Sequence, residues 1–116
     1  MKVPILTVLR DLEGIPLRDA KVVDSEGKLL RAERDFTLRK ACTEALQANG
    51  LTGDSPDGEE RYKRFRLAMK IMTSDEPDLT ADEIVLVKRL IGLAFGAVVV
   101  GRAYEILDPT PSAPQP

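Results

Sequence analysis

The feature that most constrains the fold is the uncharged run from Leu90 to Gly101, twelve mostly apolar residues inside the segment LTADEIVLVKRLIGLAFGAVVVGRAYEIL. A membrane-spanning helix needs about twenty consecutive, mostly apolar residues. Here Lys88 and Arg89 precede the run and Arg102 follows it. The run is therefore too short to cross a membrane, and we predict that it closes the core of a folded domain.

A helix is predicted to begin at the start of this segment and to break within it. Thr80 can cap the helix while Glu83, three residues later, bonds back to the cap. An unbroken helix to Leu107 would be about 40 Å long at 1.5 Å per residue, longer than a domain of this length is wide. We expect two packed helices, antiparallel or steeply crossed, with a break at Gly96 favoured over one at Gly92. These two glycines also form a G-x-x-x-G pattern, for which we favour close packing or a turn over a dimerisation face.

The N-terminal part of the chain has a β pattern instead. Short apolar runs between about residues 3 and 30 are separated by the acidic turns Asp11–Gly14 and Asp24–Gly27. Runs of that length with such turns predict a small antiparallel β element of two or three strands. A lone hairpin would be only marginally stable, so we expect this element to pack on the helices.

Two further helices are predicted between these regions. The first, with Asp35 or Thr37 as its cap, ends at the Asn49–Gly50 stop. The second runs from about residue 57 to residue 72. One face of the second helix carries Tyr62, Phe65, Met69 and Met72.

Together these patterns predict the fold class and the domain limits. Residues 1–108 are expected to form a single compact α+β domain, mostly α-helical, in which a small N-terminal antiparallel β element is followed by about four helices over residues 37–107. Residues 109–116 contain four prolines and are expected to form an extended tail.

The chain contains no histidine, which limits the chemistry that it can perform. The commonest general base and metal ligand is missing, and neither a Ser-His nor a Cys-His nucleophile can be assembled. The nineteen acidic residues give no pair that stands out as a carboxylate site. We therefore expect a protein that is not an enzyme and that has no cofactor and no metal. A small enzyme that uses carboxylates is kept as an alternative class.

Three weaker patterns have structural explanations. The segment from Val22 to Glu33 can be aligned with a calcium-binding loop, but Val22 occupies the first ligand position, which is normally Asp, and a hairpin turn explains the same residues. The glycines near the C-terminus lack the spacing of a phosphate-binding loop. Cys42, the single cysteine, lies on an apolar helix face, so we expect a buried structural thiol in a reducing compartment.

The most suggestive surface feature is the basic helix over residues 59–72, in which positive charges alternate with aromatic rings. This face can be merely solvated, or it can meet an acidic protein or nucleic acid, and we rank the three in that order. Seventeen basic and nineteen acidic residues give a formal net charge of -2, which provides no overall field to attract nucleic acid. Arg64 and Arg66 are expected on the solvent side. The candidate partner-binding residues are Arg61, Lys63, Arg64, Arg66 and Lys70.

Four segments, in this order, carry a resemblance to a known family: TVLRDLEGIPLRD, FTLRKACTEAL, ERYKRFRLAMKI and LTADEIVLVKRLIGLAFGAVVVGRAYEIL. Over about residues 5 to 107 the chain resembles a family of small uncharacterised bacteriophage and prophage proteins. It departs from that family by inserting AKVVDSEGKLLRAER before the second segment. The resemblance implies a phage origin and carries over no functional residues.

We therefore expect a non-enzymatic phage or prophage accessory protein that binds another protein, either in virion assembly or to inhibit a host factor. The alternative is a nucleic-acid-binding accessory protein that uses the basic helix. The MKVP start lacks the features of a signal peptide, so the host cytoplasm or the virion is the expected location, and no membrane partner is expected.

Overall fold

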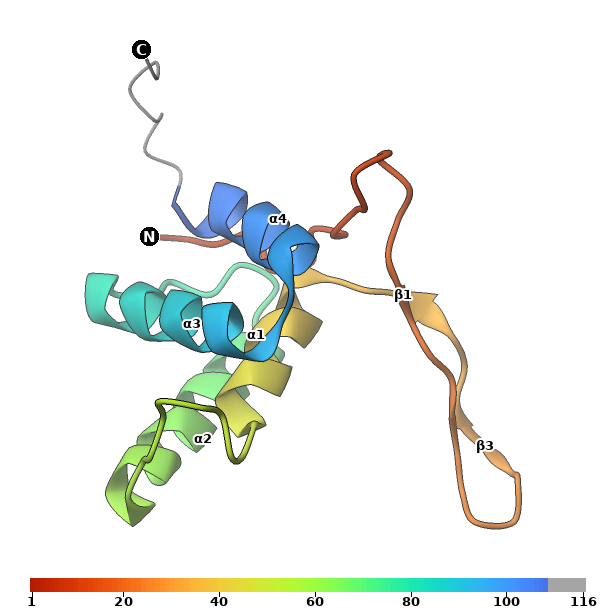
Figure 1. The fold of residues 1–116 in the computed structure, drawn as a ribbon, viewed down its shortest axis with the longest axis horizontal. Coiled ribbons are helices and arrows are strands. Elements are labelled where there is room, and N and C mark those ends of the chain that lie inside the picture. Colours follow the sequence, from red (N-terminus) through yellow and green to blue (C-terminus); the bar gives the residue numbers. More distant parts are fainter. Residues whose placement is uncertain (109–116) are drawn as a thin grey trace.

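The computed structural model describes residues 1–108, so the predicted tail at 109–116 lies outside the described residues. Within them, short antiparallel strand pairs precede four helices, which confirms the predicted α+β class (Figure 1). The strands are β1 (Arg18–Asp19), β2 (Val22–Val23), β3 (Leu29–Arg31) and β4 (Arg34–Asp35). The helices are α1 (Leu38–Gln47), α2 (Gly58–Met72), α3 (Ala81–Ala94) and α4 (Ala97–Leu107).

Side-chain caps fix where three of the helices begin. Thr37 caps α1 and Asp57 caps α2, each by accepting a hydrogen bond from a backbone N–H of the first turn. At the start of α3, the Thr80 side chain and the Glu83 side chain bond reciprocally to each other's backbone, which is the predicted capping box. These starts lie where the sequence places them because each depends on residues within one helical turn.

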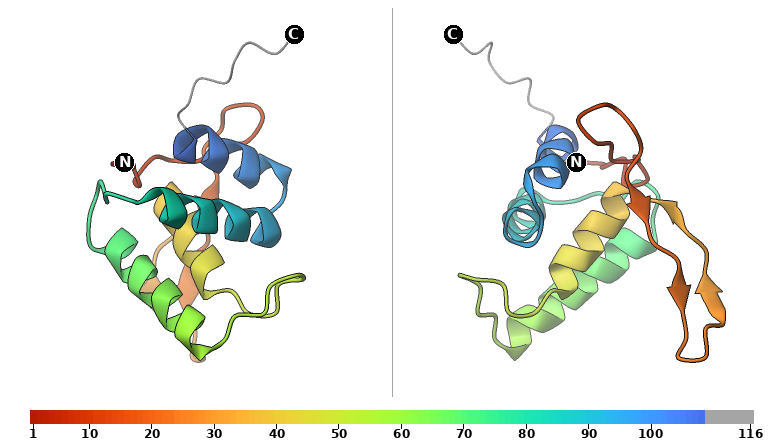
Figure 2. Two further views of the ribbon diagram at one scale, coloured as in Figure 1. Left: turned by 90° about the vertical axis from the view of Figure 1, so that its left-hand side faces the viewer. Right: turned by 45° about the vertical axis from the view of Figure 1, so that its right-hand side comes forward.

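The predicted break between the last two helices is also confirmed. Phe95 and Gly96 are the cap residues between α3 and α4, and α4 lies alongside α3 (Figure 2). The Tyr104 hydroxyl of α4 donates a 2.6 Å hydrogen bond to the carbonyl of Lys88 in α3. A Cβ atom added to Gly92 would lie 2.8 Å from that hydroxyl oxygen, so Gly92 permits the close packing of these helices. None of the helices in residues 1–108 has the length and apolar character that a membrane span requires.

The N-terminal segment is part of the core although it forms none of the named strands. Val3, Ile5 and Leu9 are at most 1% exposed. The Val3 N–H donates to the carbonyl of Pro77 at 3.0 Å, and the Ile5 carbonyl accepts from the backbone of Arg39 at 2.8 Å. The first nine residues are therefore held between the start of α1 and the segment before α3.

The apolar run from Leu90 to Gly101 contributes to the core mainly through its first residues. Leu90 and Ile91 are fully buried, whereas Leu93 is 41% exposed. Val99 and Val100 are half-buried against the same core. The other large buried side chains come from all four helices and include Leu38, Cys42, Ile71, Val87 and Leu107.

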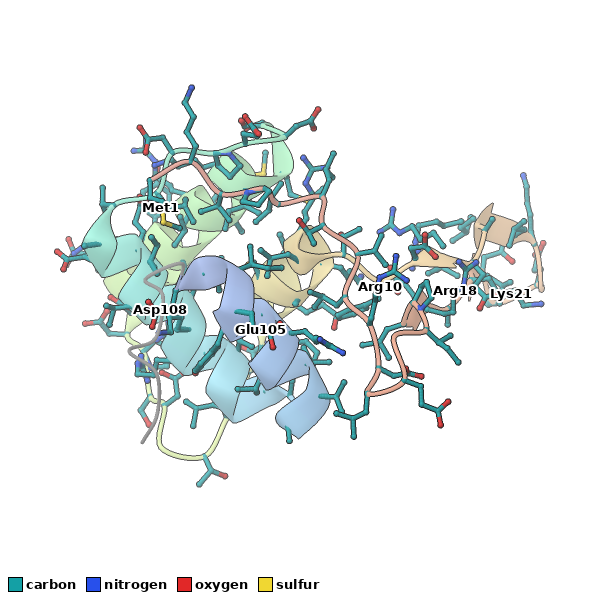
Figure 3. All side chains as sticks on the ribbon, turned by 90° about the horizontal axis from the view of Figure 1, so that it is seen from above. Met1, Arg10, Arg18, Lys21, Glu105 and Asp108 are labelled. Carbon is teal, nitrogen blue, oxygen red and sulfur yellow. The ribbon has the colours of Figure 1, made fainter. Side chains whose placement is uncertain are left out.

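Residues 18–35 form a β arm that projects from the helices (Figures 1 and 2). Strand β1 pairs with β4 near the helices and β2 pairs with β3 further out, both antiparallel. The expectation that the β element packs on the helices is wrong for this outer part. Its four large apolar side chains are 41% to 62% exposed: Val22, Val23, Leu29 and Leu30. Figure 3 shows Arg18 and Lys21 along the arm, well away from Met1 and Asp108.

Ion pairs around one carboxylate hold the base of the arm. The side chain of Asp19 is 11% exposed and accepts hydrogen bonds from Arg31 at 3.0 Å and Arg34 at 3.1 Å, while the Lys40 Nζ atom of α1 lies 4.0 Å away. Burial by itself would raise the pKa of Asp19, but Arg34, Lys40 and Arg31 together lower it below the usual value. Arg31, Arg34 and Asp19 thus tie the strands at the base of the arm to one another, and Lys40 is the helical residue that approaches this cluster.

Candidate functional site

The five basic residues of α2 do not form one surface, because Arg64 is buried. Its side chain is 4% exposed, and its two terminal nitrogens lie 2.8 Å from the two carboxylate oxygens of Asp54. The expectation that Arg64 faces solvent is therefore wrong. The loop between α1 and α2 places Asp54 beneath the helix, where it forms a bidentate pair. The hydrogen bond from Arg64 lowers the pKa of Asp54, and Arg89 of α3 approaches the same carboxylate at 3.4 Å.

The other four basic residues lie on different sides of α2. Lys70 is paired with Glu83 of α3 at 3.0 Å. Lys63 and Arg66 line a hollow of about 430 Å³ that also contains acidic residues, among them Glu60 and Asp82. Positive and negative charges therefore alternate along that side. The fourth, Arg61, lies in a different groove on the α1 side of the helix.

The apolar residues of α2 occupy two faces, of which only one is buried. Leu67, Ala68 and Ile71 are at most 8% exposed and pack into the core. The other face, predicted to carry Tyr62, Phe65, Met69 and Met72 together, is open to solvent. These four side chains are 59%, 60%, 47% and 51% exposed, in that order. The rings of Tyr62 and Phe65 on it stack with centroids 6.4 Å apart. We call this face the α2 stripe; it consists of Tyr62, Phe65, Met69 and Met72.

Most of the α2 stripe forms one wall of a groove of about 420 Å³. The C-terminal half of α1, with Thr43, Leu46 and Gln47, forms the opposite wall. A second hollow of about 370 Å³ adjoins this groove and shares Thr43, Gln47 and Met72 with it. We call the two together the α1–α2 trough. Its basic lining residues are Arg34, Arg39, Lys40, Arg61 and Arg64, and no Asp or Glu among residues 1–108 lines it.

The single thiol of the chain, Cys42, lies in the core. Burial raises the pKa of the Cys42 thiol to about 12, so the thiol is protonated at neutral pH. This agrees with the predicted structural cysteine. No group of three or more Asp, Glu or Cys side chains in residues 1–108 is placed to hold a metal ion. What the α1–α2 trough offers is an apolar floor with basic side chains at both ends.

Three components of this surface escaped the sequence analysis: Asp54, the exposure of the α2 stripe, and Leu6, which lines the second hollow. One signal for the stripe was present in the sequence. Helix α2 carries large apolar residues on two faces, which is more than a helix needs to cover one core. An excess of this kind leaves one apolar face of the helix outside the core.

Comparison of the chain with protein-family models, with curated proteins and with solved structures found no match in any of the three. Evidence for a function therefore comes from the surface of the molecule.

Proposed function

We propose that the chain is a non-enzymatic accessory protein of a bacteriophage or prophage that acts by binding another protein, in virion assembly or by inhibiting a host factor. The phage origin is supported by the sequence resemblance, and the host cytoplasm or the virion is the proposed location. The observation that carries protein binding is the α2 stripe. Its four large side chains are each about half exposed at helical spacing.

The composition of the α2 stripe supports a protein partner. Aromatic residues and methionine are enriched at the centres of protein interfaces, and methionine adapts its shape to different partners. Covering such a face removes apolar area from water, which is worth about 25 cal/mol per Å². A contiguous exposed apolar patch on a small domain is typical of an interaction site.

Photo-crosslinking in bacterial cells during phage production tests this proposal. A photoreactive amino acid placed at Met69 of the α2 stripe should give a discrete crosslinked product with another protein. The matched control is Val85 of α3, which is 65% exposed and lies outside the stripe. Identical products at both positions, or no product at Met69, would refute binding through the stripe.

Nucleic-acid binding through residues 59–72 is the second candidate. It is supported by three basic residues of α2 that form no salt bridge within residues 1–108: Arg61, Lys63 and Arg66. It ranks second because Asp54 neutralises Arg64 and Glu83 pairs with Lys70.

Fluorescence anisotropy with DNA and RNA over a range of salt concentrations separates the two candidates. If the chain acts by binding a protein, we expect its complexes with DNA and RNA to have dissociation constants no tighter than about micromolar at physiological salt. A nanomolar complex that weakens steeply with salt, and that is lost in the double variant Arg61→Glu, Arg66→Glu, would favour nucleic acid instead.

A further inference from the structure

We infer that the α1–α2 trough binds an amphipathic α-helix of a partner protein whose edges carry carboxylates. This inference rests on the proposed protein-binding function and adds the chemistry of the partner. It combines two observations: the apolar shape of the trough and the sign of the charges that line it.

The shape of the trough suits a helix. Leu46 of α1 and Ala68 of α2 are 5% and 8% exposed and form part of its floor. Phe65, Met69 and Met72 stand along one side and are largely exposed. A third helix that lies between two packed helices can place apolar side chains at positions i, i+3, i+4 and i+7 into such a groove.

The charges select an acidic occupant. Arg61 lines the first hollow and has no salt bridge within residues 1–108. Arg34 and Lys40 line the second hollow, where Arg34 pairs with Asp19 and Lys40 pairs with Glu44, so Arg61 carries most of the available positive charge. No acidic residue of the described chain lines either hollow. Carboxylates on the edges of a bound helix would complement this lining. A second copy of the chain would present the same basic lining.

Arg64 and Arg61 have different roles in the trough. Asp54 already holds both terminal nitrogens of Arg64, so that residue forms part of the wall and offers little net charge. The same loop contributes Pro56 to the lining of the first hollow. Arg61 is therefore the residue of the first hollow whose charge is available to a partner.

Two synthetic peptides test the inference. Both have about 18 residues, or about five helical turns, with leucines on one face. One has glutamates along the edges of that face, and the other has lysines at the same positions. In fluorescence anisotropy with the full chain, we expect the glutamate peptide to bind and the lysine peptide to bind at least about tenfold more weakly, because it would face like charges.

Two pairs of variants locate the site. Arg61→Glu should lower the affinity for the glutamate peptide about tenfold. Lys63→Glu makes the same charge change on the same helix but outside the trough, so it should leave this affinity unchanged. Met69→Ala should also weaken binding, and Val85→Ala on the exposed surface of α3 should not. Circular dichroism checks that all four variants keep the fold.

Several results would overturn the inference. Equal affinity for the two peptides would show nonspecific apolar adsorption, and equal effects of Arg61→Glu and Lys63→Glu would show a response to net charge alone. Absence of binding by the glutamate peptide would also overturn it. Should crosslinking at Met69 still succeed in that case, the proposed protein binding would stand without the acidic helix. Failure of both experiments would remove both proposals.

Discussion

The helical body, which comprises residues 1–17 and 36–107, contains an apolar core, whereas the outer part of the β arm leaves its large apolar side chains exposed. In the body, apolar side chains such as Leu90 and Ile91 are fully buried, whereas Leu29 and Leu30 of the arm are 54% and 62% exposed. The arm is fixed at its base by the charges around Asp19. The body should therefore respond most strongly to lost packing and the arm to lost charge.

The largest difference in stability is expected when an apolar residue is replaced by aspartate in the body and in the arm. Ile91→Asp would bury a carboxylate without a partner, at a cost of about 5 kcal/mol or more, comparable to the whole stability of many domains. Leu30→Asp in the arm should change the free energy of unfolding by less than about 0.5 kcal/mol. Urea unfolding followed by circular dichroism measures both. A similar loss in the two variants would contradict the view that the arm stands apart from the core.

The next largest difference concerns two arginines of one helix. Arg64→Glu would place a second carboxylate against Asp54 inside the body, so we expect a large fall in Tm. Arg66→Glu changes an exposed residue and should leave Tm almost unchanged. Thermal melting of the two variants side by side makes the comparison, and equal Tm values would mean that the Asp54–Arg64 pair contributes nothing to the body.

Acid should loosen the arm at Asp19. Because the pKa of Asp19 is lowered in the folded chain, its ion pairs contribute fully to stability above the ordinary aspartate pKa of about 4, and this contribution is lost as the pH falls further through the lowered pKa of the folded chain. Amide hydrogen exchange of β1 and β4 should accelerate there, and Asp19→Asn should abolish this pH step. The acid response of the helices should persist in that variant, since the pKa values of Asp54, Asp78 and Glu83 are also lowered. A pH step in the arm that survives Asp19→Asn would contradict this assignment.

The smallest effects separate two glycines. Gly27, in the turn of the arm, has a φ angle of 83°, so Gly27→Ala should strain the turn by about 1 kcal/mol and accelerate exchange only in the arm. Gly101 lies within α4, and nothing lies within 4 Å of an added Cβ atom there. Gly101→Ala should stabilise the body by up to about 1 kcal/mol, seen as a higher Tm. A Tm lowered by Gly27→Ala would instead show that the arm and the body unfold together.

Features that depend on neighbouring residues are predictable from the sequence, and contacts between distant segments are not. The cap Thr80 and the break favoured at Gly96 depend on residues within one turn, and the sequence places both correctly. Thr37 is one of the two caps predicted for α1, and α2 begins next to the predicted residue 57. The burial of Arg64 depends on where a loop residue ten positions away falls in space. Helical spacing identifies the members of the α2 stripe, but it does not say which of the two apolar faces of the helix the core covers.

The position of the first residues also has a consequence for the synthesis of the protein. The amino group of Met1 donates a 2.9 Å hydrogen bond to the carbonyl of Leu79, 78 positions along the chain, and Ile5 shares one core with Leu107. The apolar residues at positions 3, 5 and 9 therefore leave the ribosome well before their partners near Leu79 and Leu107. The core of the body can close only after Leu107 has been synthesised, and until then Val3, Ile5 and Leu9 are available to chaperones.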